Sequence, residues 1–328
     1  MTKKRTILFL VVVLTIFADL RGQDPVFSHF HANSLRTNPA LAGADGPMRI
    51  YAGYRNQWPA GGSAYNTYEA AFDQYFEKLQ GGIGVHVLND RQGDGTFNSV
   101  HLDVIYAYQF RASRRLSFSG ALQAGGGQRS FNPGQLVFGD MLDPLTGDIV
   151  GVGEEIQGYS RLFPDFATGV AASYDNIYGG IAVHHLLRPN VTDDDPSGRL
   201  SRRYTVHAGI MIPVYEKGRG REIVTLSPGM VYFQQQRIQQ ISYGLDVVYR
   251  DFLVGLQMRH DWLFDYGNII FSMGYDAGKV RFRYSYDVRL SSPAVRLPTM
   301  GAHEISLLII NQKQGIRKHR SAIKYPKI

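Results

Sequence analysis

Adjacent histidines and short acidic or glycine-rich turns are the features of this sequence whose residue types and spacing could support chemistry. His184 and His185 are neighbours in an apolar segment. Neighbouring residues of a strand point to opposite faces, so these two rings could not chelate one ion. The stretch 90–95, DRQGDG, has the start of a calcium loop but lacks its ligand spacing and closing glutamate. A Gly/Asp-rich turn is therefore the favoured interpretation, with weak loop calcium as the alternative.

The remaining candidates for a metal, phosphate or catalytic site are weaker. The acidic run 193–195 favours a solvated turn over a metal site. The Gly-x-Gly stretch 151–153 is followed by Glu154 and Glu155, whose charges would repel a phosphate. Serine and histidine are plentiful, but no nucleophile elbow or convincing Ser-His-acid trio is present. We therefore expect no catalytic residue, no metal and no cofactor, and predict that the protein is not an enzyme.

Composition narrows the class of protein further. The chain has 328 residues, 44% of them hydrophobic, and no cysteine. This excludes wholesale disorder, disulfides, thiolate metal sites and a lipidated N-terminal cysteine. The net charge of +7 comes largely from the first 22 residues and the C-terminal tail. A nucleic-acid-binding module needs a basic folded face, so no nucleic-acid partner is expected.

The N-terminus has the pattern of a secretory signal peptide. Lys3, Lys4 and Arg5 precede an apolar run, 7–17, that is too short to span a bilayer comfortably, and the small residue Gly22 marks a plausible cleavage point. We predict a signal peptide at 1–22, with an uncleaved anchor helix as the alternative. The mature chain would then begin at Gln23 and cross the inner membrane.

Beyond residue 46 the sequence alternates with period two, which is typical of strands with one apolar face. Residues 100, 102, 104, 106 and 108 are apolar or aromatic, whereas Ser99, His101 and Asp103 share the opposite face. Fourteen such segments are predicted, at 47–58, 64–75, 80–89, 97–110, 115–128, 165–175, 177–187, 202–214, 221–233, 238–250, 252–261, 267–276, 279–288 and 302–311.

The connections between these segments alternate between short and long, which is the pattern of an outer-membrane barrel. We therefore predict an all-β transmembrane barrel of about 14 antiparallel strands, with long extracellular loops and short periplasmic turns. Within the mature chain, 23–46 would be a periplasmic or lumen-plugging segment, 47–311 the barrel and 312–328 a basic periplasmic tail. Aromatic rings at strand ends are expected in the membrane interfaces; they are Trp58, Trp262, Tyr75, Tyr108, Tyr174, Tyr249 and Tyr275.

Several sequence blocks, in order along nearly the whole mature chain, resemble the PorP/SprF family of Bacteroidetes outer-membrane proteins. They include NPALAG at 38–43, YRNQWP at 54–59, GAHEISL at 301–307 and AIKYPKI at 322–328. The family often has a cysteine before the proline of the last block, and here that residue is Tyr325. Any role of that cysteine is therefore not carried over.

The resemblance implies a role in type IX secretion or gliding motility. It implies an outer-membrane barrel that helps to export or anchor a large secreted or surface-exposed protein through that protein's C-terminal region. Other secretion or gliding components and outer-membrane lipid would be its further partners. The alternative from the sequence is a passive or substrate-specific transport barrel for small molecules.

The blocks shared with the family suggest residues with partner-binding or structural roles. Glu304 shares a face with Ser306 that we expect to line the lumen, where Arg281 or Arg283 on the preceding strand could neutralise it. The full candidate set is Arg55, Asn56, Gln57, Trp58, His303, Glu304, Lys324 and Pro326.

Overall fold

The computed structural model describes residues 24–59, 65–136, 141, 143, 146, 156–192, 198–217, 221–262, 267–290 and 301–311. The predicted signal peptide, the acidic run 193–195, the stretch 151–155 and the basic tail with Lys324 and Pro326 lie outside the described residues. No helix in the described ranges has the length and hydropathy needed to cross a membrane.

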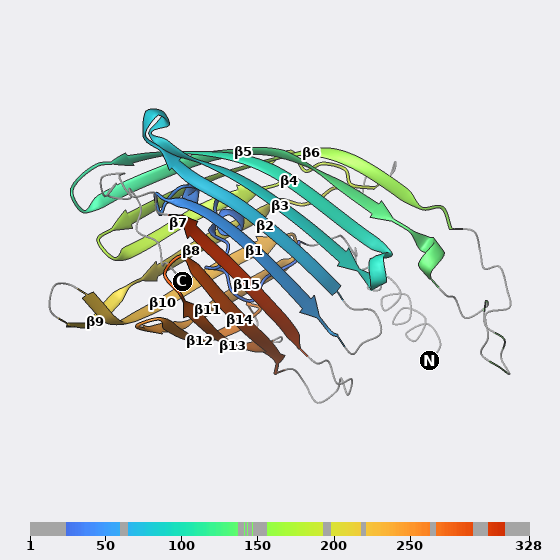
Figure 1. Ribbon diagram of the computed structural model, residues 1–328. Coiled ribbons are helices and arrows are strands. Elements are labelled where there is room, and N and C mark those ends of the chain that lie inside the picture. The colour runs from blue at the N-terminus through green and yellow to red at the C-terminus, as the bar shows by residue number, and fades with distance from the viewer. Residues whose placement is uncertain are drawn as a thin grey trace, which may run out of the picture.

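Strands dominate the described chain (Figure 1). The helical turns are short: α2 (Ser34–Thr37), η1 (Pro39–Leu41), η2 (Glu77–Leu79), η3 (Gly93–Gly95) and η4 (Pro133–Gln135). The strands are β1 (Met48–Gln57), β2 (Tyr65–Phe76), β3 (Gly81–Gln92), β4 (Phe97–Arg111), β5 (Leu116–Phe131), β6 (Tyr159–Tyr174), β7 (Ile177–His184), β8 (Arg203–Ile210), β9 (Ile212–Lys217), β10 (Arg221–Gln235), β11 (Ile238–Tyr249), β12 (Phe252–His260), β13 (Gly267–Asp276), β14 (Val280–Arg289) and β15 (Ala302–Asn311).

These strands form one closed antiparallel barrel. β1 pairs with both β2 and β15, and β10 pairs with both β8 and β11, so the described sheet has no terminal edge apart from local gaps. β9 continues β8 beyond Met211, and both pair with β10. The wall therefore has fourteen strand positions, and the predicted antiparallel barrel is confirmed.

On the strands, apolar residues face outward and polar residues face the interior, which is the reverse of a soluble protein. On β4, Leu102, Val104 and Tyr106 are exposed on the outer face, whereas Asp103 is buried on the luminal face. The apolar residues on the outer face of each strand can be buried only against lipid, because the closed wall turns the other face toward the lumen. The polar face of the sequence pattern therefore identifies the residues that line the interior.

The two ends of the barrel differ. One end carries short turns, such as 175–176 and 250–251, and is called the short-turn end. The other carries longer joins, such as 132–158 and 185–202, and is called the long-loop end.

β6 begins at Tyr159, six residues before the predicted start at 165. Pro164 lies within it, and proline is tolerated there because this part of β6 pairs with β5 while β7 joins only from Thr168.

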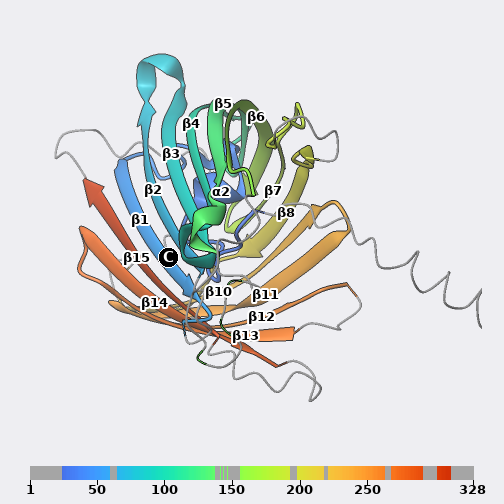
Figure 2. The same cartoon turned by 90° about the vertical axis from the view of Figure 1, so that its right-hand side faces the viewer.

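Residues 24–47, called the plug below, lie inside the ring of strands (Figure 2). Leu35, Ala40, Leu41 and Ala42 of the plug form an apolar cluster with small wall residues, among them Ala107, Ala121 and Ala171. η1 packs against β4, β5 and β6. A short helical stretch thus supplies the hydrophobic core that the barrel wall, apolar on its outer face, lacks.

Glycines in the wall allow the plug backbone to come close. A side chain at Gly82 on β3 would collide with the carbonyl of Ala42, and Gly43 takes a left-handed φ of +67° beside it. Only glycine adopts that backbone angle without strain. At Gly180 on β7, an added Cβ would lie 2.6 Å from the Asn38 side-chain nitrogen. Gly82 thus gives room to the plug backbone, and Gly180 gives room both to Asn38 of the plug and to the neighbouring strand at Val170.

We expect Gly82→Ala to destabilise the barrel by about 1–3 kcal/mol, the usual cost of overpacking a close contact. Gly120→Ala is the matched control, since a Cβ at Gly120 meets nothing within 4 Å. The measurement is urea unfolding in detergent followed by tryptophan fluorescence. Equal unfolding midpoints for the two variants would contradict a plug seated against β3.

Candidate functional site

A buried charge cluster ties the start of the plug to the wall where the barrel closes. The Glu304 carboxylate accepts hydrogen bonds from the backbone N–H of Ser28 at 2.6 Å and of His29 at 3.4 Å, and it lies 3.5 Å from the Arg55 guanidinium. Arg55 also donates to Ser28 and lies 3.3 Å from Asp287. Each charge in this cluster has a partner, as burial requires.

The prediction that Arg281 or Arg283 pairs with Glu304 is wrong. Arg281 pairs with Asp276 at 2.6 Å, and the guanidinium of Arg283 contacts the ring of His29. Barrel closure places Arg55 of β1 directly across from Glu304 of β15. The charge partner therefore comes from the first strand rather than from the preceding one.

A second cluster fixes the end of the plug to β1 and β2. Arg49 lies 2.6 Å from Asp45 and 3.0 Å from Asp73, and it donates to the Ser34 hydroxyl at 2.8 Å. Asp73 also accepts the backbone N–H of Gly43 at 2.7 Å. The plug is thus anchored at both of its ends through buried, charge-assisted hydrogen bonds.

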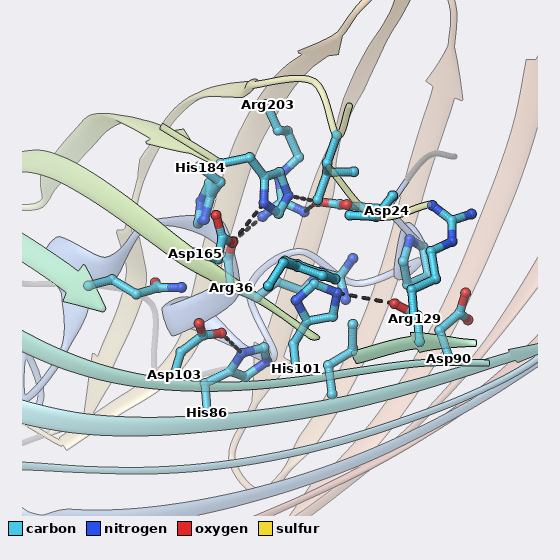
Figure 3. Close-up of a pocket in the computed structure, with 18 of the residues that line it drawn as sticks. Asp24, Arg36, His86, Asp90, His101, Asp103, Arg129, Asp165, His184 and Arg203 are labelled. Atoms are coloured by element: carbon cyan, nitrogen blue, oxygen red, sulfur yellow. Dashed lines mark hydrogen bonds and ion pairs between the residues drawn. The ribbon is translucent and has the colours of Figure 1, made fainter. Parts of the chain in front are cut away.

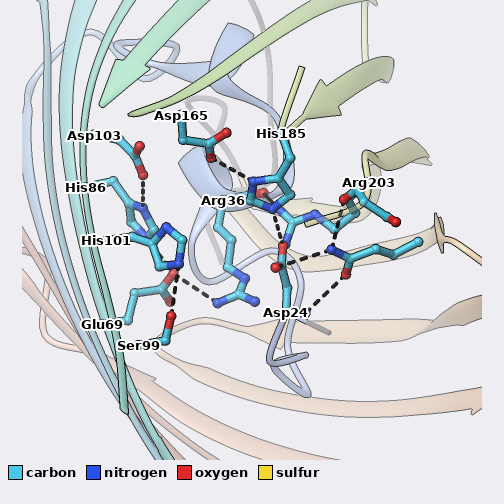
Figure 4. Close-up of polar contacts among 12 residues, drawn as sticks. Asp24, Arg36, Glu69, His86, Ser99, His101, Asp103, Asp165, His185 and Arg203 are labelled. Atoms are coloured by element: carbon cyan, nitrogen blue, oxygen red, sulfur yellow. Dashed lines mark hydrogen bonds and ion pairs between the residues drawn. The ribbon is translucent and has the colours of Figure 1, made fainter. Parts of the chain in front are cut away.

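A third cluster holds Asp24 near the long-loop end (Figure 4). Its carboxylate lies 2.9 Å from His185 and 2.7 Å from Arg203, and His185 also contacts Asp165 at 2.7 Å. Burial alone would raise the pKa of Asp24, but the charges of His185 and Arg203 outweigh it and hold that pKa well below its usual value. Burial likewise opposes protonation of His185, yet Asp24 and Asp165 raise its pKa to about 9.

His184 and His185 do not point to opposite faces as the sequence pattern predicts. β7 ends at His184, and His185 takes a left-handed φ of 56°. This turn breaks the strand alternation, so both rings line the same cavity, with centroids 6.4 Å apart. Among the described residues, no group of three or more His, Asp or Glu is arranged to hold a metal ion.

The cavity lies between the plug and β3–β8, toward the long-loop end (Figure 3). Its volume is about 70 Å³, and its lining is mostly polar and charged. From the plug come Asp24 and Arg36. The wall contributes His86, Asp90, Ser99, His101, Asp103, Gln123, Arg129, Asp165, His184 and Arg203. Eleven ionisable side chains thus border one cavity.

Most of these cavity residues were not among the predicted site residues. Ser99, His101 and Asp103 do share the polar face of a predicted strand, which is the sequence signal that could have identified them. Asp90 belongs to β3 and accepts hydrogen bonds from Thr67 and Gln92, both at 2.7 Å. Calcium at 90–95 stays an untested alternative.

The predicted candidates on β1 and β15 fall on both faces of the wall. Arg55, Gln57 and Glu304 share the luminal face, whereas Asn56 and His303, paired across the two strands, share the outer face. His303 contacts the Tyr284 hydroxyl at 2.7 Å, and Asn56 bonds to Asn66. The structure thus joins Arg55 and Glu304 and separates them from Asn56 and His303.

The predicted interface aromatics sort to the two ends of the barrel. Trp58 and Trp262 follow β1 and β12 at the long-loop end, and Trp262 is 64% exposed. Tyr108, Tyr174, Tyr249 and Tyr275 are exposed on the outer face near the short-turn end. Tyr75 is different, because it lies on the luminal face of β2. Their role in the membrane interface stays a prediction.

We expect the barrel to lose stability as the pH rises from 6.5 to 9. A folded pKa of about 9 for His185, against 6.5 unfolded, means that its stabilisation is complete below pH 6.5 and lost at about pH 9. The difference is at most about 3 kcal/mol. Urea unfolding across this range should show a steeper loss for the wild type than for His185→Gln. His303→Gln, on the outer face at the same end, should follow the wild type.

Comparison with solved structures finds similar chains, and the two named here share little sequence identity with this one. The CymD monoaromatic hydrocarbon channel is 13% identical with a TM-score of 0.49, and the match covers 88% of this chain and 95% of that one. Omp33 of Acinetobacter baumannii is 9% identical with a TM-score of 0.46, and the match covers 82% of this chain and 100% of that one. Both TM-scores are below 0.5. No curated protein matches.

A family model does match. The model for the type IX secretion system membrane protein PorP/SprF covers residues 20–309, which include the plug and all but the last residues of the barrel. The family, the closed barrel and its apolar outer face agree on the outer membrane as its location. The chain belongs to the PorP/SprF family of type IX secretion membrane proteins.

Proposed function

We propose that this protein is a non-enzymatic outer-membrane barrel that assists the export or surface anchoring of a large partner protein by the type IX secretion or gliding machinery. Membership of the family carries the proposal. The partner would engage the long-loop end through its C-terminal region. The other secretion or gliding components would be further partners of the same barrel.

The filled lumen supports a protein-handling role over solute transport. The plug is anchored at Asp24, Ser28 and Ser34 by buried ion pairs and hydrogen bonds with strands on different sides of the barrel. An open channel needs a continuous water path. A barrel of fourteen strands is wide enough for such a path, provided that nothing fills its lumen. Here the plug and its apolar cluster occupy it.

We expect the purified wild-type barrel to conduct no ions in planar lipid bilayers. A variant lacking residues 24–46 should conduct, because the plug contacts the luminal face of both halves of the wall. Heat-modifiable migration on SDS gels would establish that the shortened barrel is folded. Steady conductance by the wild type would favour the alternative, a small-molecule transport barrel.

A pull-down from the native outer membrane tests the partner directly. A tag placed in the 132–158 join, between β5 and β6, leaves the C-terminal tail free. Solubilisation in mild detergent followed by mass spectrometry should recover a large surface or secreted protein together with secretion-machine subunits. The same tag on an unrelated barrel of this membrane is the control. A lone barrel, free of both classes of protein, would contradict the proposal.

A further inference from the structure

We infer that the cavity between the plug and β3–β8 is a binding site for a carboxylate, delivered from the long-loop end. This rests on the proposed function and adds to it the chemistry by which the barrel recognises its partner. The cavity is enclosed by the plug residues Asp24 and Arg36 on one side and by the wall on the other (Figure 3).

Buried polar atoms of residues that line this cavity lack hydrogen-bond partners among the described residues. The Nε2 atom of His184, the Nη1 atom of Arg36 and the Nε atom of Arg203 have none, and the Oδ1 atom of Asp103 has none either. An unsatisfied buried group costs about 1–3 kcal/mol, so several in one cavity indicate a site completed by something polar.

The charges left without close partners are positive. Arg129 lines the cavity and has no acidic oxygen within 4.0 Å among the described residues. Arg36 reaches only 3.7 Å from Glu69, and its Nη1 makes no hydrogen bond. A carboxylate bound between such guanidinium groups would gain charge-assisted, forked hydrogen bonds.

The acidic side chains of the cavity already have donors, apart from the free Oδ1 of Asp103. Asp24 and Asp165 are engaged by His185 and Arg203 (Figure 4). Asp103 contacts His86 at 3.3 Å, and Asp90 accepts hydrogen bonds from Thr67 and Gln92. The side chains that are left to bind a ligand are therefore two guanidinium groups and neutral donors. These favour an anion over a cation.

The shape of the site limits the ligand to a small group on a chain. At roughly 10–15 Å³ for each water, about 70 Å³ accommodates about five water molecules. A carboxylate and the carbon that bears it would replace most of them. Phe163, Val191 and Leu200 form an apolar cluster at the cavity wall against which the adjoining part of the ligand could pack. A polypeptide C-terminus and a free organic acid share this chemistry.

The test measures binding of defined probes to the purified full-length barrel by calorimetry. The probes are N-acetyl-tetraglycine with a free carboxylate, the same peptide as its C-terminal amide, and galacturonate as a small organic acid. We expect saturable binding of the free-acid peptide and at least about tenfold weaker binding of the amide, the scale of one charge-assisted hydrogen bond. Stronger binding of galacturonate than of the peptide acid would assign the site to a small acid instead.

Two variants connect the binding to the cavity. Arg129→Gln should weaken the free-acid peptide at least about tenfold. Arg161→Gln is the matched control, because Arg161 is its cross-strand neighbour on the same face but bonds to the Thr192 carbonyl at 2.7 Å and does not line the cavity. Heat-modifiable migration on gels verifies that both variants are folded.

Equal binding of acid and amide, no saturable binding of any probe, or equal losses in the two variants would overturn the inference. In those cases the cavity holds water alone or the binding lies elsewhere. The pull-down distinguishes this failure from that of the proposed function. If calorimetry has failed in one of these ways, a partner recovered equally well by the wild type and by Arg129→Gln would leave the secretion role standing without the carboxylate site.

Discussion

The structure depends on one constraint: in lipid, every backbone N–H and C=O group of the wall must be satisfied within the wall. Closure of β1 on β15 meets that demand and fixes which face of each strand meets the membrane. The consequence is a lumen lined by charged and polar side chains that cannot all satisfy one another. The plug resolves most of this surplus, with Ser28, Asp24 and Asp45 placed against buried partners.

The plug does more than fill space, because its middle and its ends contact the wall through different kinds of interaction. Its middle, around Leu41, is apolar and seats against alanines and glycines of the wall. Its ends are held by ion pairs. The arrangement leaves a cavity with a largely charged lining on the long-loop side. A secretion accessory and a closed lumen are thus compatible properties of one barrel.

Period-two alternation and loop lengths were enough to predict the barrel, its strand number and the polar face of β4, since those follow from short-range rules. Partner choice within the lumen was not predictable in the same way. Glu304 pairs with Arg55 across the closure, and His185 turns beside His184 through one left-handed residue. Both depend on long-range geometry or a single backbone angle, which residue spacing does not reveal. The cavity likewise exists only once the plug is seated.

The pairing of Arg55 with Glu304 also couples closure of the wall to the seating of the plug. Arg55 lies on β1 and Glu304 on β15, the two strands whose pairing closes the barrel. Ser28 bonds to both side chains, through its hydroxyl to Arg55 and through its backbone N–H to Glu304. A wall in which β1 and β15 had parted would therefore leave the start of the plug with only one of these two contacts.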